Sequence, residues 1–258
     1  TGEAISGDNT GRAGDYSLSI STQGGPWLAS EAHTQRGIQG LTVDLDRADS
    51  NSELYTVVAN SPWGLVVETA DDLSGVVGNE LVGVHRFNRL RIAGDADVDF
   101  GGDRIEVTDL ANLEITEADL RNVDLDQATL DYLAVNNVSG RIHLSLPAVY
   151  DNLTLQSGDY RFGQLTVNGT LAIGGAARVV ATEITASSLV IDAVTVTVET
   201  LNVSGDIHLL NGATLTVPTA TTNPDVLHTL AITAGGQVTI DATSGIDLTG
   251  KGYPGGRS

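Results

Sequence analysis

The chain has 258 residues, with 33 acidic and 13 basic side chains, a formal net charge of −20 at pH 7, and no cysteine or methionine. This length can bury one large core or two small ones, and the lack of cysteine excludes disulfide scaffolds and thiolate metal sites. Nucleic acids and anionic membranes bind clustered lysine and arginine, so the charge argues against both partners. No apolar run approaches the roughly 20 residues that cross a bilayer, so we expect no membrane span.

The kind of charge also carries information. Aspartate outnumbers glutamate by 23 to 10, and Lys251 is the single lysine beside 12 arginines. Such a surface stays soluble at high ionic strength or in calcium-rich water, which favours a halophilic, marine or extracellular setting. Genome base composition explains the low lysine content equally well. Because position 1 is not methionine, we expect a processed product or a piece of a longer chain, with the further domains of that parent chain as its nearest partners.

Residues 1–80 predict an irregular β-rich N-terminal region or cap. Apolar and polar residues alternate in short runs between turns rich in glycine, serine, threonine and asparagine. The expected strands are Tyr16–Ile20, Leu41–Val43, Leu54–Val58 and Leu65–Val67. The motif Ile38-x-x-Leu41-x-Val43 is similar to a repeat found in residues 81–250. It is either a degenerate first coil or part of a unit that closes a stacked array, as such arrays require.

Residues 81–250 contain an internal repeat, and residues 251–258 form a glycine-rich tail or linker. Five copies share an apolar residue three positions before a leucine and a branched aliphatic two positions after it, and three copies add glycine at the fourth position. The aligned leucines are Leu90, Leu133, Leu165, Leu201 and Leu230. Irregular spacing suits stacked coils with variable loops. We expect these leucines to be buried in one aliphatic core.

The local period within the repeat region is two, which predicts strands of three to five residues, and helix signals are nearly absent. Residues 113–137 follow a five-residue step, and Ala118-Asp119-Leu120-Arg121-Asn122 resembles the pentapeptide-repeat family. A step of five drifts off any helical face. We therefore expect this stretch to form one coil of a solenoid.

Two stretches resemble the coils of secreted bacterial adhesins of the filamentous-haemagglutinin kind. They are Leu165-Thr-Val-Asn-Gly-Thr-Leu-Ala-Ile-Gly-Gly-Ala176 and Leu201-Asn-Val-Ser-Gly-Asp-Ile-His-Leu-Leu-Asn-Gly-Ala-Thr-Leu-Thr-Val217. The resemblance implies an all-β fold, a parallel β-helix. Crossovers between parallel strands are nearly always right-handed, so we expect a right-handed coil.

Calcium is the metal that the acidic residues suit best. Five acidic residues stand at positions 1, 3, 5, 9 and 12 of a stretch with EF-hand-like spacing: Asp95, Asp97, Asp99, Asp103 and Glu106. However, Phe100 occupies the sixth position, where the EF-hand turn needs glycine. The alternative is one strand with its aspartates in solvent. A second candidate set with the same ambiguity is Asp44, Asp46, Asp49, Asn51 and Glu53.

Other chemistry has weaker signals. The adjacent pair Asp71-Asp72 reads better as an acidic turn than as a catalytic pair. The histidines are spread singly, and His143 and His208 should face outward from mid-strand. Four Asn-x-Ser/Thr sequons occur, at Asn137, Asn152, Asn168 and Asn202. Chance explains their number, and they matter only if the source organism glycosylates its exported proteins.

Together these features predict a non-catalytic β-solenoid segment of a larger extracellular or cell-surface protein, acting as a spacer or an adhesion platform. Its partners would include a cell-surface glycan or protein. The alternative is a parallel β-helix that binds or cleaves carbohydrate. Sugars stack on exposed aromatic rings, and few aromatics occur in the repeat region (Tyr132, Tyr150 and Tyr160). That scarcity favours the structural interpretation.

Overall fold

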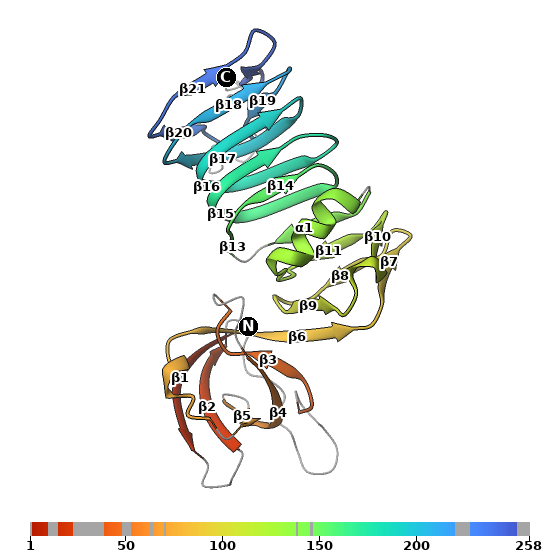
Figure 1. The fold of residues 1–258 in the computed structure, drawn as a ribbon, viewed down its shortest axis with the longest axis vertical. Helices are drawn as coiled ribbons and strands as arrows, with labels where there is room; N and C mark the ends of the chain where they lie inside the picture. Colours follow the sequence, from red (N-terminus) through yellow and green to blue (C-terminus); the bar gives the residue numbers. More distant parts are fainter. Residues whose placement is uncertain are drawn as a thin grey trace, which may run out of the picture. The chain divides into compact units, whose positions relative to one another are not determined.

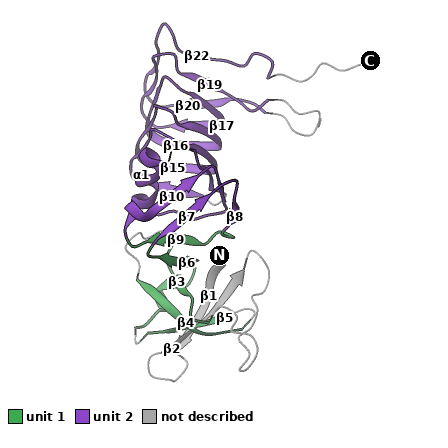
Figure 2. Cartoon of the chain, turned by 90° about the vertical axis from the view of Figure 1, so that its right-hand side faces the viewer, with its two compact units in different colours: residues 1–88, 100–108 green, residues 89–99, 109–258 purple. Residues whose placement is uncertain are grey.

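The computed structural model describes residues 2–9, 15–22, 39–47, 53–61, 64–69, 71–137, 139–144, 147–219 and 228–251, the first two ranges as backbone only. His33, Ile38, Asp49 and Asn51 lie outside the described residues. The chain divides into two compact units, which Figure 2 colours separately. Unit 1 holds residues 1–88 and 100–108, and unit 2 holds residues 89–99 and 109–258.

Unit 1 is a ladder of antiparallel strands that closes on itself. The strand order is β1-β2-β5-β4-β3-β6, and β1 also pairs with β6. A final strand, β9, pairs with β6 in parallel. The elements are β1 (Gly2–Asn9), β2 (Asp15–Thr22), β3 (Thr42–Asp44), β4 (Leu54–Ser61), β5 (Gly64–Glu68), the 3-10 turn η1 (Ser74–Val76), β6 (Glu80–Phe87) and β9 (Arg104–Val107).

The four strands expected before residue 80 are confirmed, because three lie within β2, β4 and β5 and the fourth, Leu41–Val43, overlaps β3. Aliphatics of β3, β4, β5 and β6 and of the adjoining turns form a buried core of their own: Val43, Leu45, Val57, Leu65, Val67, Leu73 and Leu81. The motif ending at Val43 is not a degenerate coil. Its strand β3 lies antiparallel to both β4 and β6, whereas stacked coils pair in parallel.

Unit 2 is a parallel β-solenoid, and the chain makes about 7 turns in all. Figure 1 shows its strands stacked in succession towards the C-terminal end. Two long strands, β15 (Asp159–Ile173) and β16 (Arg178–Asp192), each bend around three faces, here called faces B, C and A in chain order. The predicted parallel β-solenoid is therefore confirmed. The right-handed winding stays a prediction.

The other strands of unit 2 stack on those faces. Face B holds β8 (Asp97–Asp99), β11 (Asp119–Arg121), β12 (Arg141–Leu144), the start of β17 (Thr195–Val203), β19 (Thr214–Thr216) and β22 (Gly245–Ile246). Face C holds β13 (Ala148–Tyr150), the end of β17 and β20 (Ala231–Ala234). Face A holds β7 (Leu90–Ala93), β10 (Leu113–Thr116), β14 (Leu153–Leu155), β18 (Ile207–Leu210) and β21 (Val238–Ile240). The 3-10 turn η2 (Leu110–Asn112) precedes β10.

The turn of the solenoid is shorter than the spacing of the sequence repeats. Leu165 pairs with Ile184, and Ile184 pairs with Leu201, which are steps of 19 and 17 residues. Leu165 and Leu201 are therefore two turns apart. The repeat motif does not include the turn between them, because Ile184 stands where the motif has leucine. In the last copy of the repeat, the residue that pairs with Leu201 is Ile232 and not Leu230, so the predicted position is two residues too early.

Burial of the repeat leucines follows this register. Leu133, Leu165 and Leu201 are buried, whereas Leu90 and Leu230 are only half-buried. Inward residues on consecutive turns of face B stack directly, from Leu120 through Ile142 to Tyr160. These chains of side chains form the core of the solenoid.

The expectation that residues 113–137 form a complete coil of strands is wrong in its second half. Residues up to Leu125 keep the five-residue step with their apolar members buried, but α1 (Gln127–Asn136) replaces the strands that should follow. Asp126 caps this helix, because its Oδ1 accepts a hydrogen bond of 2.7 Å from the Thr129 amide. Leu130, Leu133 and Ala134 bury one side of α1, so the helix fills the core in place of a strand.

The glycine of the repeat has a steric reason. A Cβ at Gly169 would lie 2.2 Å from Asn152 Oδ1, and a Cβ at Gly205 would lie 2.7 Å from the carbonyl oxygen of Ser187. Both glycines stand at a corner where the previous turn approaches closely. Gly169 and Gly205 therefore permit the corner between faces C and A, whereas Gly94 follows β7 at the corner between faces A and B, where its φ of +69° favours glycine.

Candidate functional site

The five residues predicted to hold calcium are divided between the two units. Asp95, Asp97 and Asp99 belong to unit 2, and Asp103 and Glu106 belong to unit 1. Asp97 and Asp99 point into solvent from β8, with the half-buried Val98 between them. This alternation matches the interpretation of one strand with a solvated acidic face.

Four of these five carboxylates already have partners. Arg121 Nε lies 2.6 Å from Asp97 Oδ1, and Asn122 Nδ2 donates to Asp99 Oδ2 at 2.8 Å. In unit 1, His85 Nε2 lies 3.1 Å from Asp103 Oδ2, and Arg86 Nε lies 2.7 Å from Glu106 Oε2. Within the described ranges, no group of three or more histidine, aspartate or glutamate side chains is arranged to hold a metal ion.

The second acidic set contains a buried ion pair. Asp44 is fully buried on β3, and Arg104 Nη1 on β9 donates to its Oδ2 at 2.5 Å. The Asp46 amide donates to the other oxygen, Asp44 Oδ1, at 2.9 Å. Glu53 is exposed and accepts a hydrogen bond from the Tyr55 hydroxyl. Asp44 thus serves the packing of unit 1, through a basic partner that the spacing of acidic residues did not indicate.

Face B carries two outward columns of charged side chains. One column runs Asp97, Asp119, Arg141, Asp159, and the neighbouring column runs Asp99, Arg121, His143, Arg161. Arg141 binds Asp119 of the preceding turn through two hydrogen bonds, of 2.5 Å and 2.9 Å. That bidentate contact lowers the pKa of Asp119 below its usual value.

The centre of face B holds polar atoms without a hydrogen-bond partner. They are His143 Nε2 and Asp159 Oδ1, both inaccessible to water, on the adjacent strands β12 and β15. Burial lowers the pKa of His143, and the positive charge of Arg161 lowers it further. No ion pair involves Arg161 or Arg178 within the described part of the chain. We call His143, Asp159, Arg161 and Arg178 the face B cluster.

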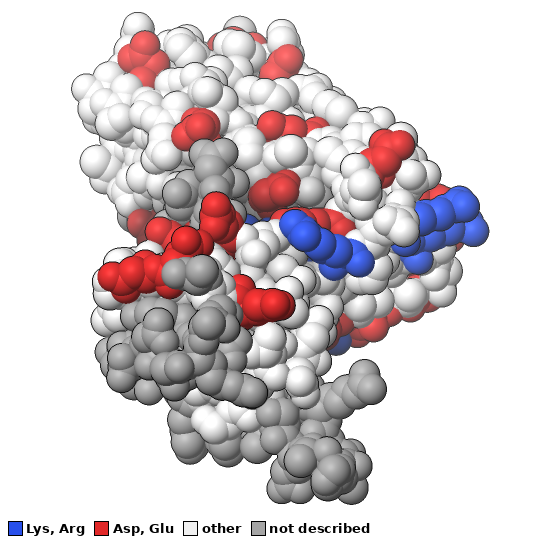
Figure 3. All heavy atoms as spheres, turned by 60° about the horizontal axis from the view of Figure 1, so that its bottom comes forward, with Lys and Arg blue, Asp and Glu red and all other residues white. Residues whose placement is uncertain are grey.

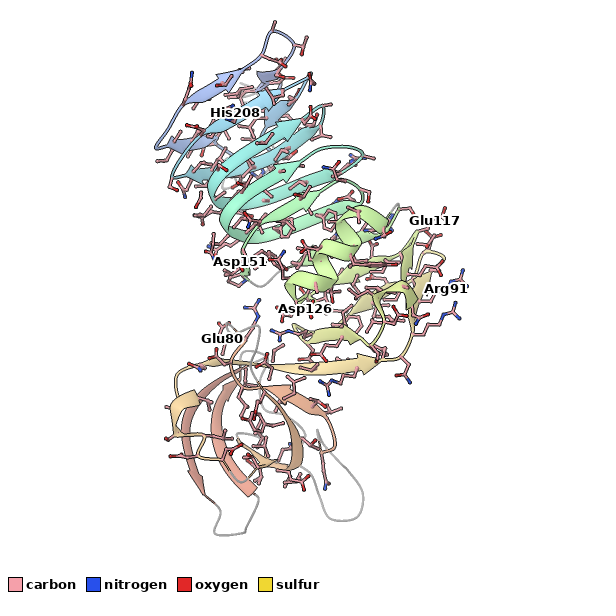
Figure 4. The ribbon with its side chains drawn as sticks, viewed as in Figure 1. Glu80, Arg91, Glu117, Asp126, Asp151 and His208 are labelled. Carbon is pink, nitrogen blue, oxygen red and sulfur yellow. The ribbon has the colours of Figure 1, made fainter. Side chains whose placement is uncertain are left out.

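Similar contacts join neighbouring turns elsewhere on the solenoid. Arg91 Nε lies 3.1 Å from Glu114 Oε2, and Figure 4 shows Arg91 extending outward. Asn202 Nδ2 donates to Glu183 Oε1, and Asn211 Nδ2 donates to Asp192 Oδ1. On the face drawn in Figure 3, acidic side chains are scattered and the basic ones lie near acidic ones. These outward polar groups bind the neighbouring turn.

The remaining candidates form local structure. Thr69 Oγ1 donates to Asp71 Oδ2, and the Ser74 amide donates to Asp72 Oδ1, so Asp71-Asp72 forms the expected acidic turn before η1. His143 and His208 face outward as expected, since the apolar residues beside them are buried.

Comparison of the chain with protein families, characterised proteins and solved structures finds no match. Among the described residues, no helix is long and apolar enough to cross a membrane. The class of protein is therefore set by its fold alone, as a β-solenoid.

Proposed function

We propose that this chain is a non-catalytic scaffold, a β-solenoid segment of a larger extracellular or cell-surface protein that acts as a spacer or a platform for adhesion, like the coils of bacterial adhesins. The observation that carries the proposal is the pairing of outward charges between consecutive turns. Arg121 with Asp97 and Arg141 with Asp119 are both contacts of this kind. Groups used in this way stiffen the stack and do not converge on a substrate.

Two of the three tyrosines of the repeat region support the same proposal, and the third, Tyr132, is half-buried on α1. Tyr150 and Tyr160 are buried inside the solenoid, and Tyr160 stacks on Phe162 with ring centroids 6.2 Å apart. Their rings are unavailable to sugars, which bind proteins by stacking on exposed aromatic faces. The abundant exposed carboxylates also suit a surface that works in salt water.

A spacer must hold a fixed distance, and the chain is suited to testing this. Because it has no cysteine, the double variant Asp97→Cys/Gly245→Cys takes spin labels at two chosen sites only. These residues stand in the same outward column on the first and last of the eight strands that form the face B path. Seven steps of about 4.8 Å predict about 34 Å between the two backbones.

We expect one narrow distance distribution near that value, after allowance for the labels, and the same width at 0.1 M and 1 M salt. A broad or multimodal distribution would show a flexible segment and reject the spacer. A matched pair, Asp119→Cys/Gly245→Cys, should shorten the distance by one turn of about 4.8 Å. Release of reducing ends from any polysaccharide by the unmodified chain would instead identify an enzyme.

The face B cluster favours a second candidate, binding of an acidic glycan. Two arginines without ion pairs can bind carboxylate or sulfate groups, and the unpartnered atoms of His143 and Asp159 can exchange hydrogen bonds with hydroxyl groups once the side chains above them move. We expect Arg161→Gln/Arg178→Gln to abolish any binding to uronate or sulfated oligosaccharides measured by calorimetry. Arg91→Gln, which changes a paired arginine of face A, is the control. Absence of heat with the unmodified chain rejects this candidate.

A further inference from the structure

The last turn of the solenoid exposes residues at positions that the turn before it buries. Ile232, Val238, Ile240 and Ile246 occupy the inward positions of β20, β21 and β22, in register with Leu201, Ile207, Leu209 and Leu215 of the turn before. The four residues of the earlier turn are 0–1% exposed, whereas the four of the last turn are 37–46% exposed. Among the described residues no turn stacks on β20, β21 and β22, and this accounts for the difference, since the apolar pattern is the same in both turns.

The backbone edge of this turn is also open on all three faces. β20, β21 and β22 each pair with one strand only, within the described residues, and they run parallel to it. Proteins usually protect such edges with charged residues, proline or bulges. The segments Ala231–Ala234, Val238–Ile240 and Gly245–Ile246 contain no charge and no proline. Figure 1 shows β21 at the blue C-terminal end of the stack.

The turns on either side of β22 are well formed. Asp241 accepts hydrogen bonds from the amides of Asn211, Thr243 and Ser244, and these bonds lower its pKa. Asp247 accepts a bond of 2.9 Å from the Thr249 amide, which lowers the pKa of Asp247 as well. The last turn is thus a regular turn of the solenoid.

We propose that this end is a docking surface for a further parallel coil of the same polypeptide, stacked in register on β20, β21 and β22. Continuity argues for this occupant. From β12, β13 and β14 onward, each boundary between turns joins parallel edges on all three faces and covers aliphatics at the same positions. Only a coil of the same winding satisfies all three edges at once. A second copy related by a two-fold axis would present antiparallel edges. The inference concerns the end of the solenoid and holds whether or not the scaffold is a spacer.

The test inserts a duplicate of residues 199–217 between Leu248 and Thr249 of the full chain. The register of β17, β19 and β22 places the duplicated Leu201 over Ile232 and the duplicated Leu209 over Ile240. Hydrogen exchange read by mass spectrometry should show at least about tenfold slower exchange of the amides of residues 231–246. The control insertion replaces the four inward aliphatics of the duplicate by serine and should leave exchange unchanged.

Two results overturn the proposal. Equal exchange with and without the aliphatic duplicate would show that the end accepts no coil. Concentration-dependent self-association of the unmodified chain, abolished by Ile240→Lys and retained by Val135→Lys, would make a second copy the occupant. Val135 is the control because it is 57% exposed on α1, away from the last turn.

Discussion

Asp44 and Arg104 form an ion pair of 2.5 Å between strands that are 60 residues apart in sequence, and their side chains are 0% and 9% exposed. Removal of one partner leaves the other buried without its charge partner. We therefore expect Arg104→Met to lower the free energy of unfolding by about 3–5 kcal/mol. Urea unfolding of the full chain, followed by circular dichroism, measures the loss.

The double variant Asp44→Asn/Arg104→Met is the matched control. It removes both charges, so its loss should be clearly smaller than the sum of the two single losses. Additive losses would mean that Asp44 and Arg104 contribute independently to the free energy of unfolding.

The core of the solenoid predicts a contrast between adjacent residues of β15. Leu165 is 1% exposed, whereas its neighbour Thr166 points outward. Leu165→Ala should cost about 2–5 kcal/mol, because burial is lost and a cavity remains. Thr166→Ala should lower the free energy of unfolding by much less than Leu165→Ala does. Comparable losses in thermal unfolding would contradict the assignment of inward and outward positions.

The Asp119–Arg141 pair predicts a dependence of stability on acid. The lowered pKa of Asp119 means that the proton binds the unfolded chain more readily than the folded chain. The stabilisation is complete above the unfolded pKa of about 3.9 and is lost as the pH falls through the lower folded value. The stability difference between the unmodified chain and Asp119→Asn, measured by urea unfolding, should therefore shrink from pH 5 to pH 2. A difference that stays constant over this range would show that the Asp119–Arg141 pair does not contribute to the loss of stability in acid.

Calcium should stabilise the chain no more than general screening does. The carboxylates of Asp97, Asp99 and Glu106 bind neighbouring side chains, so an ion would have to displace those contacts. We expect equal melting temperatures in calcium chloride and sodium chloride at matched ionic strength. An extra increase in calcium, lost in Asp97→Asn/Asp99→Asn, would establish a site with an affinity of about 10⁻⁴ to 10⁻³ M.

The sequons differ in their availability to a glycosyltransferase. Asn137 is buried and exchanges two hydrogen bonds with Gly140, whereas Asn168 is exposed at a corner of β15. If the chain is secreted from a eukaryotic cell, glycan should occupy Asn168 and not Asn137. Peptide mapping by mass spectrometry decides this, and Asn168→Gln should remove the modification. Glycan at Asn137 would show that modification precedes folding.

Alternation of apolar residues indicated the strands, because each strand must place its aliphatics on the inner side and its polar residues outside, and the internal repeat indicated that these strands stack. Leu165, Leu201 and their neighbours follow this rule locally, so sequence reasoning found them. The same reasoning placed Asp71 and Asp72 in a turn. These features depend on residues a few positions apart, and the pattern is visible without the fold.

Tertiary structure decided what depends on stacking. The turn of 17 or 19 residues appears only when Ile184 pairs with Leu165 and Leu201, and α1 replaces strands because the core accepts its buried side as well as it accepts a strand. The partners of Asp44 and Asp97 come from Arg104 and Arg121, which lie 60 and 24 residues away. A contact over such distances is set by how turns pack, so no local spacing of acidic residues could distinguish a metal ligand from half of an ion pair.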